Sequence, residues 1–336
     1  MNTAVKNIDL PERIFTATTG SFSSLALEVF RFQYNNNVVY RQYCQTLKVA
    51  VDKIDTIEKI PFLPINFFKT HTIVTTAFEP ATIFESSGTT QTINSKHVVK
   101  DISLYEKSFT DCFTLFYGRP EEWCIIALLP SYLERNNSSL VLMAEKLIQQ
   151  SKHAQSGFYL LDTAALHETL LSLENNKQKT LLIGVTFALL DFAEKYSLPL
   201  SHTIIMETGG MKGRRKEMTR QEVHTILSKS FRSPTIHSEY GMTELLSQAY
   251  SKGDGIFTCP PWMKILIRDE DDPLTVHTSI QNKTLSGAIN IIDLANIYSC
   301  SFIATEDAGK LFGDDSFEVL GRLDNSDIRG CSLLVL

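Results

Sequence analysis

Hydroxyl side chains cluster around a glycine in the stretch FESSGTTQT at residues 84–92. Successive backbone N–H groups in a loop of small residues, together with serine and threonine hydroxyls, are donors suited to phosphate oxygens. The stretch therefore predicts a phosphate-binding loop, whose members are Ser86, Ser87, Gly88, Thr89 and Thr90. A solvated serine and threonine loop explains so short a motif equally well. The stretch is not a Walker loop, because it lacks the terminal Gly-Lys-Ser/Thr.

Two further glycine turns carry residues that could contact a nucleotide. The first, ETGGMKGRRKE, contains Gly209, Gly210 and Lys212, and taken alone it is more typical of an exposed basic turn. The second, EYGMTE at 239–244, places an aromatic ring, a glycine, a hydroxyl and a carboxylate close together in Tyr240, Gly241, Thr243 and Glu244. The ring could stack on a base, and the carboxylate is a ligand that Mg²⁺ prefers.

Alternating apolar and helix-period segments predict the elements that position these turns. Short β-branched runs begin near residues 123, 157, 180, 202 and 234, and helical stretches separate them. This alternation is typical of βαβ units with a mostly parallel sheet. The three glycine turns would then lie at the carboxyl ends of strands in one sheet, where open α/β sheets bind ligands. After about residue 245, short strands without helices predict a β-rich subdomain.

Periodicity and end signals predict individual helices. An apolar stripe in 102–117 predicts a core-facing helix, and its members are Ile102, Tyr105, Phe109, Cys112, Phe113 and Phe116. Thr219 and Glu222 form a capping-box pattern that begins the next helix after the second glycine turn. Residues 1–80 predict short helices, with 61–70 too rich in proline and aromatic residues for a regular element.

Composition limits the class of protein. The chain has 336 residues, 43% of them hydrophobic, and a net charge of −6, which argues against a nucleic-acid partner. Its six cysteines form no CxxC pair and its histidines no ligand-spaced pair, so a zinc site is not expected. The longest apolar run, at 181–190, is too short to span a membrane and predicts a buried strand-to-helix turn. We expect a cytoplasmic protein.

Five landmarks in order resemble the adenylate-forming superfamily: the hydroxyl-rich loop, the two glycine turns, TED at 305–307 and GRLD at 321–324. Three longer stretches resemble one branch of it, the LuxE-type acyl-protein synthetases. They are SEYGMTELLSQAYSKGDGIFTCPPWMK, DLANIYSCSFIATEDAG and GRLDNSDIRGCSLL. The resemblance covers roughly residues 60–336.

The resemblance implies the α/β fold of the large domain of adenylate-forming enzymes. Residues 1–80 would form a helical cap and 81–320 the core, divided into an α/β part at 81–245 and a β-rich part at 246–320. A mobile tail at 321–336 would stand in place of the C-terminal lid domain of the superfamily.

The resemblance also implies an activity. The enzyme would join a fatty acid or related carboxylic acid to ATP, with Mg²⁺, as an acyl-adenylate. It would then transfer the acyl group to one of its own cysteines, from which an acyl-CoA reductase-type protein partner could collect it. Two alternatives remain open: a free-standing acyl-CoA or acyl-carrier ligase, and a non-catalytic nucleotide-binding subunit.

Roles for nucleotide-contacting residues follow from the resemblance. Residues 86–90 would hold the pyrophosphate, and Gly209, Gly210, Tyr240 and Gly241 would frame the adenine. Thr243 would contact the α-phosphate and Glu244 would bind Mg²⁺. Asp307 and Arg322 would bind the ribose hydroxyls.

The acyl acceptor implied by the resemblance is Cys331, close to Arg329 in the tail. The alternative is a terminal strand in which Cys331 is buried as a small apolar residue.

Lys212 is the candidate replacement for the lid lysine of the superfamily, and an exposed surface lysine is the alternative. Gln91 and Thr92 stand where the superfamily carries glycine and lysine, which leaves the phosphate loop without its basic contact. His237 faces either the acyl phosphate or a partner at the end of its strand.

Overall fold

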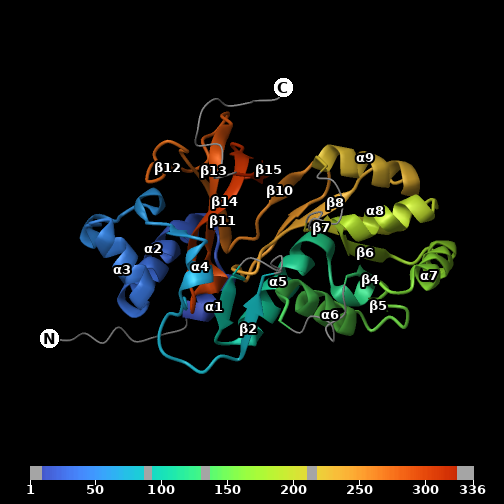
Figure 1. Ribbon diagram of the computed structural model, residues 1–336, viewed down its shortest axis with the longest axis horizontal. Coiled ribbons are helices and arrows are strands. Elements are labelled where there is room, and N and C mark those ends of the chain that lie inside the picture. Colours follow the sequence, from blue (N-terminus) through green and yellow to red (C-terminus); the bar gives the residue numbers. More distant parts are fainter. Residues whose placement is uncertain (1–9, 87–92, 130–136, 210–217, 324–336) are drawn as a thin grey trace.

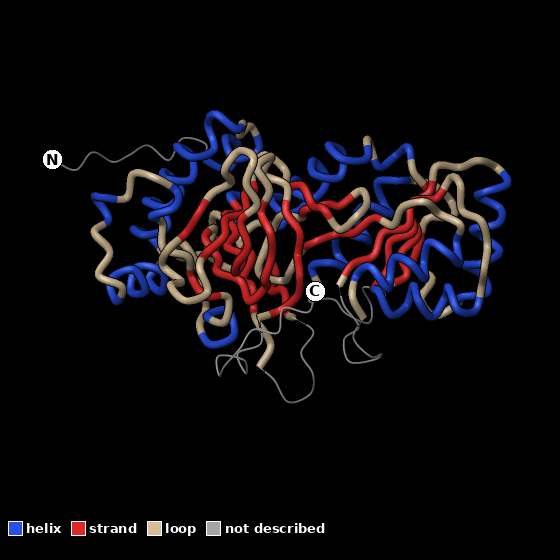
Figure 2. Tube along the Cα trace, turned by 90° about the horizontal axis from the view of Figure 1, so that it is seen from above, coloured by secondary structure: helices blue, strands red, loops and turns tan. Residues whose placement is uncertain are grey.

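Strands from both halves of the chain form one mixed sheet, flanked by helices (Figure 1). The computed structural model describes residues 10–86, 93–129, 137–209 and 218–323. Its thirteen-stranded sheet has the order β12-β11-β13-β14-β15-β10-β9-β8-β7-β6-β4-β5, with β1 paired to β14. Viewed from above, the two groups of strands lie side by side with helices on their outer sides (Figure 2).

The parallel half of the sheet comes from the alternating segment of the sequence. Its strands are β4 (Cys124–Leu128), β5 (Gly157–Phe158), β6 (Thr180–Val185), β7 (Thr203–Thr208) and β8 (His237–Tyr240). Every residue of β4 and β6 is buried, as expected for strands covered on both faces. The helices between them are α6 (Ser139–Ser151), α7 (Thr163–Asn175), α8 (Thr186–Lys195) and α9 (Arg220–Phe231).

Antiparallel strands make up the other half. They are β9 (Ala249–Ser251), β10 (Ile256–Thr258), β11 (Met263–Arg268), β12 (Val276–His277), β13 (Leu285–Asp293), β14 (Phe302–Leu311) and β15 (Phe317–Arg322). β15 continues through Arg322, so ordered strand extends past the tail boundary predicted at residue 321. This pairing places Asp307 opposite Arg322.

Helices at the beginning of the chain cover the antiparallel half (Figure 1). They are α1 (Leu10–Phe15), α2 (Thr19–Asn36) and α3 (Val38–Thr46). The proline-rich 61–70 segment, predicted to be irregular, instead contains β1 (Leu63–Pro64) and α4 (Phe67–Thr70). Single turns of 3₁₀ helix occur at Val51–Lys53, Ile57–Lys59, Pro120–Glu122 and Leu294–Asn296. None of the helices in the described ranges is long and apolar enough to cross a membrane.

The hydroxyl-rich loop is not part of the parallel sheet, contrary to the sequence-based expectation. β2 (Thr82–Glu85) pairs antiparallel with β3 (Lys96–Val99) in a separate two-stranded sheet. The physical reason is the short connection: ten residues between Glu85 and Lys96 allow a hairpin, whereas a parallel crossover needs a dozen or more. The strands on either side of the hydroxyl-rich loop therefore form a hairpin outside the parallel sheet.

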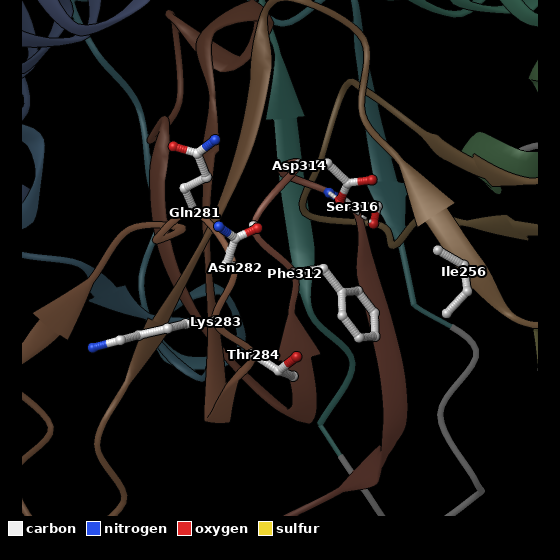
Figure 3. A pocket seen from close by; sticks show the side chains of 9 residues that line it. Ile256, Gln281, Asn282, Lys283, Thr284, Phe312, Asp314 and Ser316 are labelled. Carbon is white, nitrogen blue, oxygen red and sulfur yellow. Dashed lines mark hydrogen bonds between the residues drawn. The ribbon is translucent and has the colours of Figure 1, made fainter.

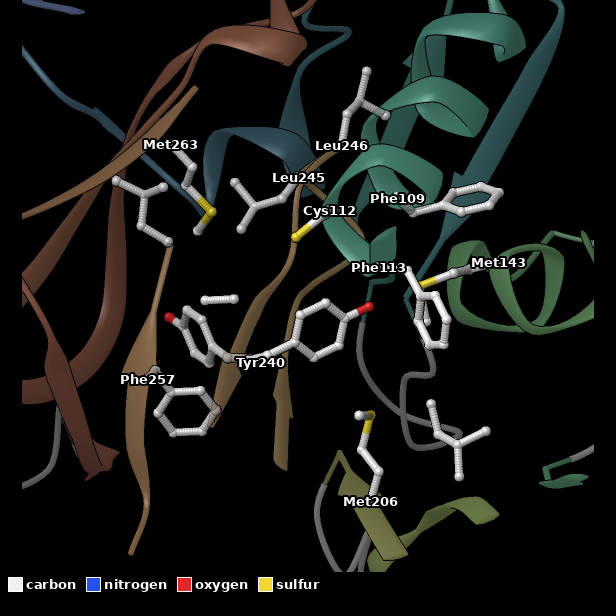
Figure 4. Close-up of a cluster of buried hydrophobic side chains, with 14 of the residues drawn as sticks. Phe109, Cys112, Phe113, Met143, Met206, Tyr240, Leu245, Leu246, Phe257 and Met263 are labelled. Carbon is white, nitrogen blue, oxygen red and sulfur yellow. The ribbon is translucent and has the colours of Figure 1, made fainter. Parts of the chain in front are cut away.

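Helix α5 (Ile102–Tyr117) confirms the predicted apolar stripe. Its side chains at 105, 109, 112 and 113 are fully buried, and those at 102 and 116 are half-buried. Figure 4 shows Phe109, Cys112 and Phe113 in one apolar cluster with Met206 and Tyr240. The predicted capping box of α9 is also present, with Thr219 and Glu222 bonded reciprocally. Local sequence signals therefore determine both helices correctly.

A buried carboxylate joins the two halves of the sheet. Asp293, at the end of β13, is fully buried and accepts hydrogen bonds from the backbone N–H groups of Leu246, Ser247 and Ala295 at 2.8, 3.1 and 3.1 Å. The Ser247 hydroxyl donates to the same carboxylate at 2.6 Å. Burial raises the pKa of Asp293 to about 6, against the effect of these donors. The turn that follows β8 is thereby tied to the antiparallel half.

We predict that Asp293→Ala lowers the free energy of unfolding by about 3–5 kcal/mol, because it leaves several buried N–H groups without an acceptor. Urea denaturation measures this change. The matched control is Asp272→Ala, which removes an acceptor from an exposed turn at Leu274 and Thr275 and should cost less than about 1 kcal/mol. Equal losses in the two variants would contradict the assigned role of Asp293.

Candidate active site

The turn after β8 carries two residues predicted to contact the phosphates and the metal. Gly241 lies beside the Glu239 carboxylate, and a Cβ at position 241 would displace that carboxylate. Thr243 is half-buried and Glu244 is 6% exposed. The sequence EYGMTE therefore folds into a tight turn that holds a buried carboxylate next to a hydroxyl residue.

Two buried side chains hold the backbone of this turn. His97 Nδ1 of β3 lies 2.8 Å from the carbonyl oxygen of Thr243. Asn296 Nδ2 donates to the carbonyl oxygen of Glu244 at 2.7 Å. Burial lowers the pKa of His97 to about 4, against the effect of its hydrogen bonds to Thr243 and Asn296. The ring is therefore neutral at pH 7.

The Glu244 carboxylate fits a Mg²⁺ site in which the phosphate oxygens of a ligand would supply further ligands to the metal. Burial raises its pKa, and a hydrogen bond with Ser95 and the charges of Arg322 and Lys69 act in the opposite direction. The described residues contain no group of three or more histidine, cysteine, aspartate or glutamate side chains able to hold a metal by themselves. Mg²⁺ commonly binds through one or two carboxylates plus phosphate oxygens, and Glu244 supplies such a carboxylate.

The residues predicted to bind adenine and ribose come together from three strands. The Tyr240 hydroxyl of β8 donates to Asp307 Oδ2 of β14 at 2.7 Å. Arg322 Nε of β15 lies 3.8 Å from Asp307 Oδ1, and its side chain is 80% exposed. The Tyr240 ring packs against Phe257 and Phe317, with centroid distances of 5.9 and 5.6 Å. The open side of this group is thus formed by Asp307 and the exposed guanidinium of Arg322.

Two buried carboxylates occupy adjacent strands beneath the site, and their surroundings separate their pKa values. Burial alone would raise the pKa of Glu207, but hydrogen bonds from His224 and Ser238 and the charge of Arg220 bring it below its usual value. Ser238 Oγ donates to Glu207 Oε1 at 2.7 Å and Arg220 Nε lies 3.6 Å from the same oxygen. Glu207 is therefore ionised.

Glu239 is the opposite case. It is buried near the end of β8, accepts a hydrogen bond from the Thr208 hydroxyl and has no cation beside it among the described residues. Burial raises its pKa to about 7, with a further contribution from the charge of Glu207. Glu239 is thus poised between its neutral and charged forms near neutral pH.

Two other predicted residues lie at strand ends in the described structure. Gly209 follows β7 with a positive φ of 68°, and its carbonyl oxygen accepts from Thr186 Oγ1 at 3.0 Å. Ser86 closes the base of the β2–β3 loop, because its Oγ accepts from the Ser95 N–H at 2.9 Å. The remaining predicted site residues lie outside the described residues: Ser87, Gly88, Thr89, Thr90, Gly210, Lys212 and Cys331.

His237 has a hydrogen-bond partner within the fold, which agrees with the second of its two predicted roles, a histidine paired at the end of its strand. Its Nδ1 lies 3.1 Å from the Tyr117 hydroxyl, and burial lowers its pKa to about 4.

The five described cysteines all have thiol pKa values raised by burial, and these are Cys44, Cys112, Cys124, Cys259 and Cys300. A thiol must ionise to act as a nucleophile, so each of these five is poorly reactive.

Two surface cavities are separate from the candidate site. One of about 580 Å³ lies between the 281–284 loop and the β14–β15 turn, with Phe312 and Asp314 on one side (Figure 3). The other, of about 390 Å³, lies between the N-terminal region and β14, lined by Tyr43, Arg268 and Glu306 among others. None of the predicted site residues within the described ranges lines either cavity.

Comparison with known proteins identifies the family. The acyl-protein synthetase family LuxE matches residues 18–336, almost the whole chain. The chain belongs to the LuxE family. Among its relatives are the long-chain-fatty-acid–luciferin-component ligases of Aliivibrio fischeri and Vibrio harveyi, which are 23% and 22% identical to it. The matches cover 92% and 93% of this chain and 86% of each relative.

Solved structures confirm the predicted fold of this LuxE-family chain. ATP-bound MatB from Rhodopseudomonas palustris superimposes with a TM-score of 0.52 at 16% identity, over 73% of this chain and 48% of that one. An ATP-bound chimera of RpMatB and BxBclM gives a TM-score of 0.53 with the same identity and coverage. The chain thus spans about half the length of these structures. Its α/β architecture is that of the N-terminal half of the adenylate-forming enzymes.

Sequence reasoning missed several residues that organise the LuxE-family site. Glu207 opens the stretch ETGGMKGRRKE, and Asp293 and Asn296 lie in the stretch DLANIYSCSFIATEDAG, but none of the three was assigned a role, and His97 lies in no quoted motif. One weak signal was available: Asp293 and Asn296 lie in the stretch DLAN, a polar pair inside an otherwise apolar segment. His97 had no such signal, because its partner Thr243 is 146 residues away.

We predict that Glu239→Gln stabilises the protein by about 2–3 kcal/mol at pH 8 and by much less at pH 5. The folded-state pKa, about 7, lies above the unfolded value of 4.5, so the folded state binds the extra proton between these values. The free energy of unfolding of the wild type therefore falls as pH rises through this window. The variant does not lose stability in this way, because its amide carries no ionisable proton. Urea denaturation at both pH values measures the difference.

Glu207→Gln is the matched control with the opposite sign. Because the folded-state pKa of Glu207 is lowered, its ionised form stabilises the fold above the unfolded pKa, and that contribution disappears as pH falls through the folded value. Glu207→Gln should therefore destabilise the protein at pH 8. An equal effect of pH on the two variants would show that the two carboxylates share one ionisation state.

Proposed function

We propose that this chain activates a fatty acid with ATP as an acyl-adenylate and then transfers the acyl group to Cys331. Family membership supports an acyl-protein synthetase activity. The observation that carries the proposal is the convergence of Tyr240, Asp307 and Arg322 beside a turn that holds Glu244 buried. In this proposal Asp307 would be the ribose acceptor and Glu244 the metal carboxylate, at the end of the sheet where open α/β folds bind nucleotides.

In the first step, a carboxylate oxygen of the fatty acid attacks the α-phosphorus of ATP, and the bond to the bridging oxygen of pyrophosphate breaks. Asp307 would accept hydrogen bonds from the ribose, and Thr243 would donate to the α-phosphate. Bound Mg²⁺ would neutralise charge on the phosphate oxygens, held by Glu244. The hydroxyl-rich loop at 86–90 would donate to the departing pyrophosphate.

In the second step, the Cys331 thiolate attacks the acyl carbonyl carbon and AMP leaves. Burial of the five described thiols supports a cysteine elsewhere as acceptor. Cys331 lies nine residues beyond Arg322, a length of chain that can extend roughly 30 Å and so can reach the adenylate. The neighbouring Arg329 would lower the thiol pKa. Release of the acyl group to an acyl-CoA reductase-type partner completes the proposed cycle.

Lys212 is proposed as the cation that assists the first step, in the role that a lid lysine performs in the wider superfamily. Its turn follows Gly209 at the end of β7, the strand next to the one that ends at Tyr240. The alternative source of positive charge is Lys69, one of the cations whose charge acts on Glu244. Lys212→Ala and Lys69→Ala, compared by their effect on turnover, distinguish the two.

Intact-mass spectrometry after incubation with ATP, Mg²⁺ and a mixture of fatty acids tests the proposal directly. The expected result is one acyl adduct per chain, whose mass gives the preferred chain length. Adenylate formation without an adduct, and product only with added coenzyme A, would instead support a free-standing acyl-CoA ligase. Binding of ATP with neither product would support a non-catalytic nucleotide-binding subunit.

We predict that Glu244→Gln reduces fatty-acid-dependent exchange of pyrophosphate into ATP by at least about 10²-fold, because the neutral amide binds Mg²⁺ weakly at the transition state. The fold should be retained, since the backbone carbonyl of Glu244, which Asn296 holds, is unchanged. The exchange assay is run across Mg²⁺ concentrations. Wild-type exchange at limiting Mg²⁺ would show that Glu244 does not hold the metal.

We predict that Cys331→Ser keeps pyrophosphate exchange within about 3-fold of wild type and eliminates the hydroxylamine-labile acyl-protein, because only the second step needs the thiolate. Labelling with radioactive fatty acid, with and without hydroxylamine treatment, measures the acyl-protein. The matched control is Cys259→Ser, which replaces a thiol that is only half-buried by area. A labile adduct that persists in Cys331→Ser and disappears in Cys259→Ser would move the acceptor to Cys259.

A further inference from the structure

His97 forms a hydrogen bond between the β2–β3 hairpin and the turn that carries Thr243 and Glu244, in addition to the one between Ser95 and Glu244. It lies on β3, is 1% exposed, and points Nδ1 at the Thr243 carbonyl oxygen, 2.8 Å away. Its ring packs edge-on against Phe68 and Phe84, with centroid distances of 5.8 and 6.5 Å. Apolar packing thus fixes the plane of the ring while one nitrogen faces the turn.

Asn296 completes a clamp on two successive carbonyl groups. Its Oδ1 lies 2.9 Å from His97 Nε2, and its Nδ2 donates to the carbonyl oxygens of Glu244 and Cys300 at 2.7 and 3.0 Å. Gln33 Nε2 in turn donates to the Asn296 carbonyl oxygen at 3.1 Å. The peptide groups of Thr243 and Glu244 are therefore held by two buried side chains that also contact each other.

The two ring nitrogens of His97 face different acceptors, Nδ1 the Thr243 carbonyl oxygen and Nε2 the Asn296 Oδ1. A carbonyl oxygen only accepts, so the bond to Thr243 requires a hydrogen on Nδ1. Because Asn296 Nδ2 is committed to two carbonyls, its Oδ1 faces Nε2 and also only accepts. A neutral imidazole has one N–H and satisfies one of these two acceptors at a time. The tautomer with the hydrogen on Nδ1 is the one that holds the Thr243 peptide.

We propose that His97 is a positioning residue for adenylate formation, acting through the Nδ1–H bond to Thr243. This bond ties the Thr243 and Glu244 peptide to strand β3, so that the α-phosphate contact of Thr243 and the metal contact of Glu244 keep fixed positions. The inference rests on the proposed function of this turn. It differs from a purely structural role because loss of the bond slows chemistry more than it weakens ATP binding.

The test compares two substitutions that each place an amide group near one of the two ring-nitrogen positions. Asparagine at position 97 can place an amide N–H near the position of Nδ1, whereas glutamine reaches the position of Nε2. In fatty-acid-dependent pyrophosphate exchange, His97→Asn should keep kcat within about 3-fold of wild type. His97→Gln should lower kcat by about 10²-fold, the scale of an error in positioning of about 1 Å, with the KM for ATP changed less than about 3-fold.

Asn37→Ala is the control for destabilisation alone. Asn37 is buried and donates to the Ser299 carbonyl oxygen at 3.0 Å, but it touches neither Thr243 nor Glu244. This variant should lower the melting temperature and leave kcat unchanged below the transition. Equal kcat in His97→Asn and His97→Gln, or losses in both that follow the melting temperature as in the control, would overturn the proposal.

Amide hydrogen exchange provides a readout that does not need activity. The N–H groups of Leu245, Leu246 and Ser247 are hydrogen-bonded in the turn, the first to Met242 and the others to Asp293. They should exchange faster in His97→Gln than in wild type and at the wild-type rate in His97→Asn. Absence of pyrophosphate exchange in wild type would reject the proposed function, and equal hydrogen exchange in the two variants would separately reject the positioning role.

Discussion

The burial of Asp293 is the constraint on which the end of the sheet that carries the candidate site depends. Its carboxylate accepts from three backbone N–H groups and one hydroxyl, and these donors come from both the turn after β8 and the start of the β13–β14 connection. A carboxylate without water around it must keep its donors, so neither segment can move away without leaving buried polar groups unpaired. The parallel and antiparallel halves of the sheet are thereby joined at the point where Glu244 lies.

Burial has different consequences for the other carboxylates near this junction. Glu207 is surrounded by donors and by Arg220, and these outweigh its desolvation, whereas Glu239 has the Thr208 hydroxyl and the charge of Glu207 beside it. The strand register brings these two carboxylates close, because Glu207 pairs with Ser238 and Thr208 with Glu239. Two acids at adjacent strand ends thus differ in charge near neutral pH, a separation that is common at functional sites.

The candidate site is assembled from segments that lie far apart in the chain. β8 supplies Tyr240, β14 supplies Asp307, β15 supplies Arg322, and the β2–β3 hairpin contributes His97. An enzyme of the LuxE family would need these groups to act on a single nucleotide, so their relative positions matter more than the strength of any one contact. The proposed acyl transfer adds a thiol that must reach this assembly and leave it again.

Local patterns in the sequence were sufficient to predict the parallel strands, the apolar stripe of α5, the capping box of α9 and the strand-to-helix turn at 185–186, because each depends on neighbouring residues. The motif order also identified the family and the residues that meet around Asp307. The short connection between β2 and β3 accounts for the separate hairpin that bounds the hydroxyl-rich loop. Tertiary structure alone decided that Glu239 is desolvated while Glu207 is ionised, and that His97 and Asn296 hold the Thr243–Glu244 peptide. These last features arise from contacts between residues of different elements, because burial and hydrogen-bond partners are properties of the packed chain and no local spacing encodes them.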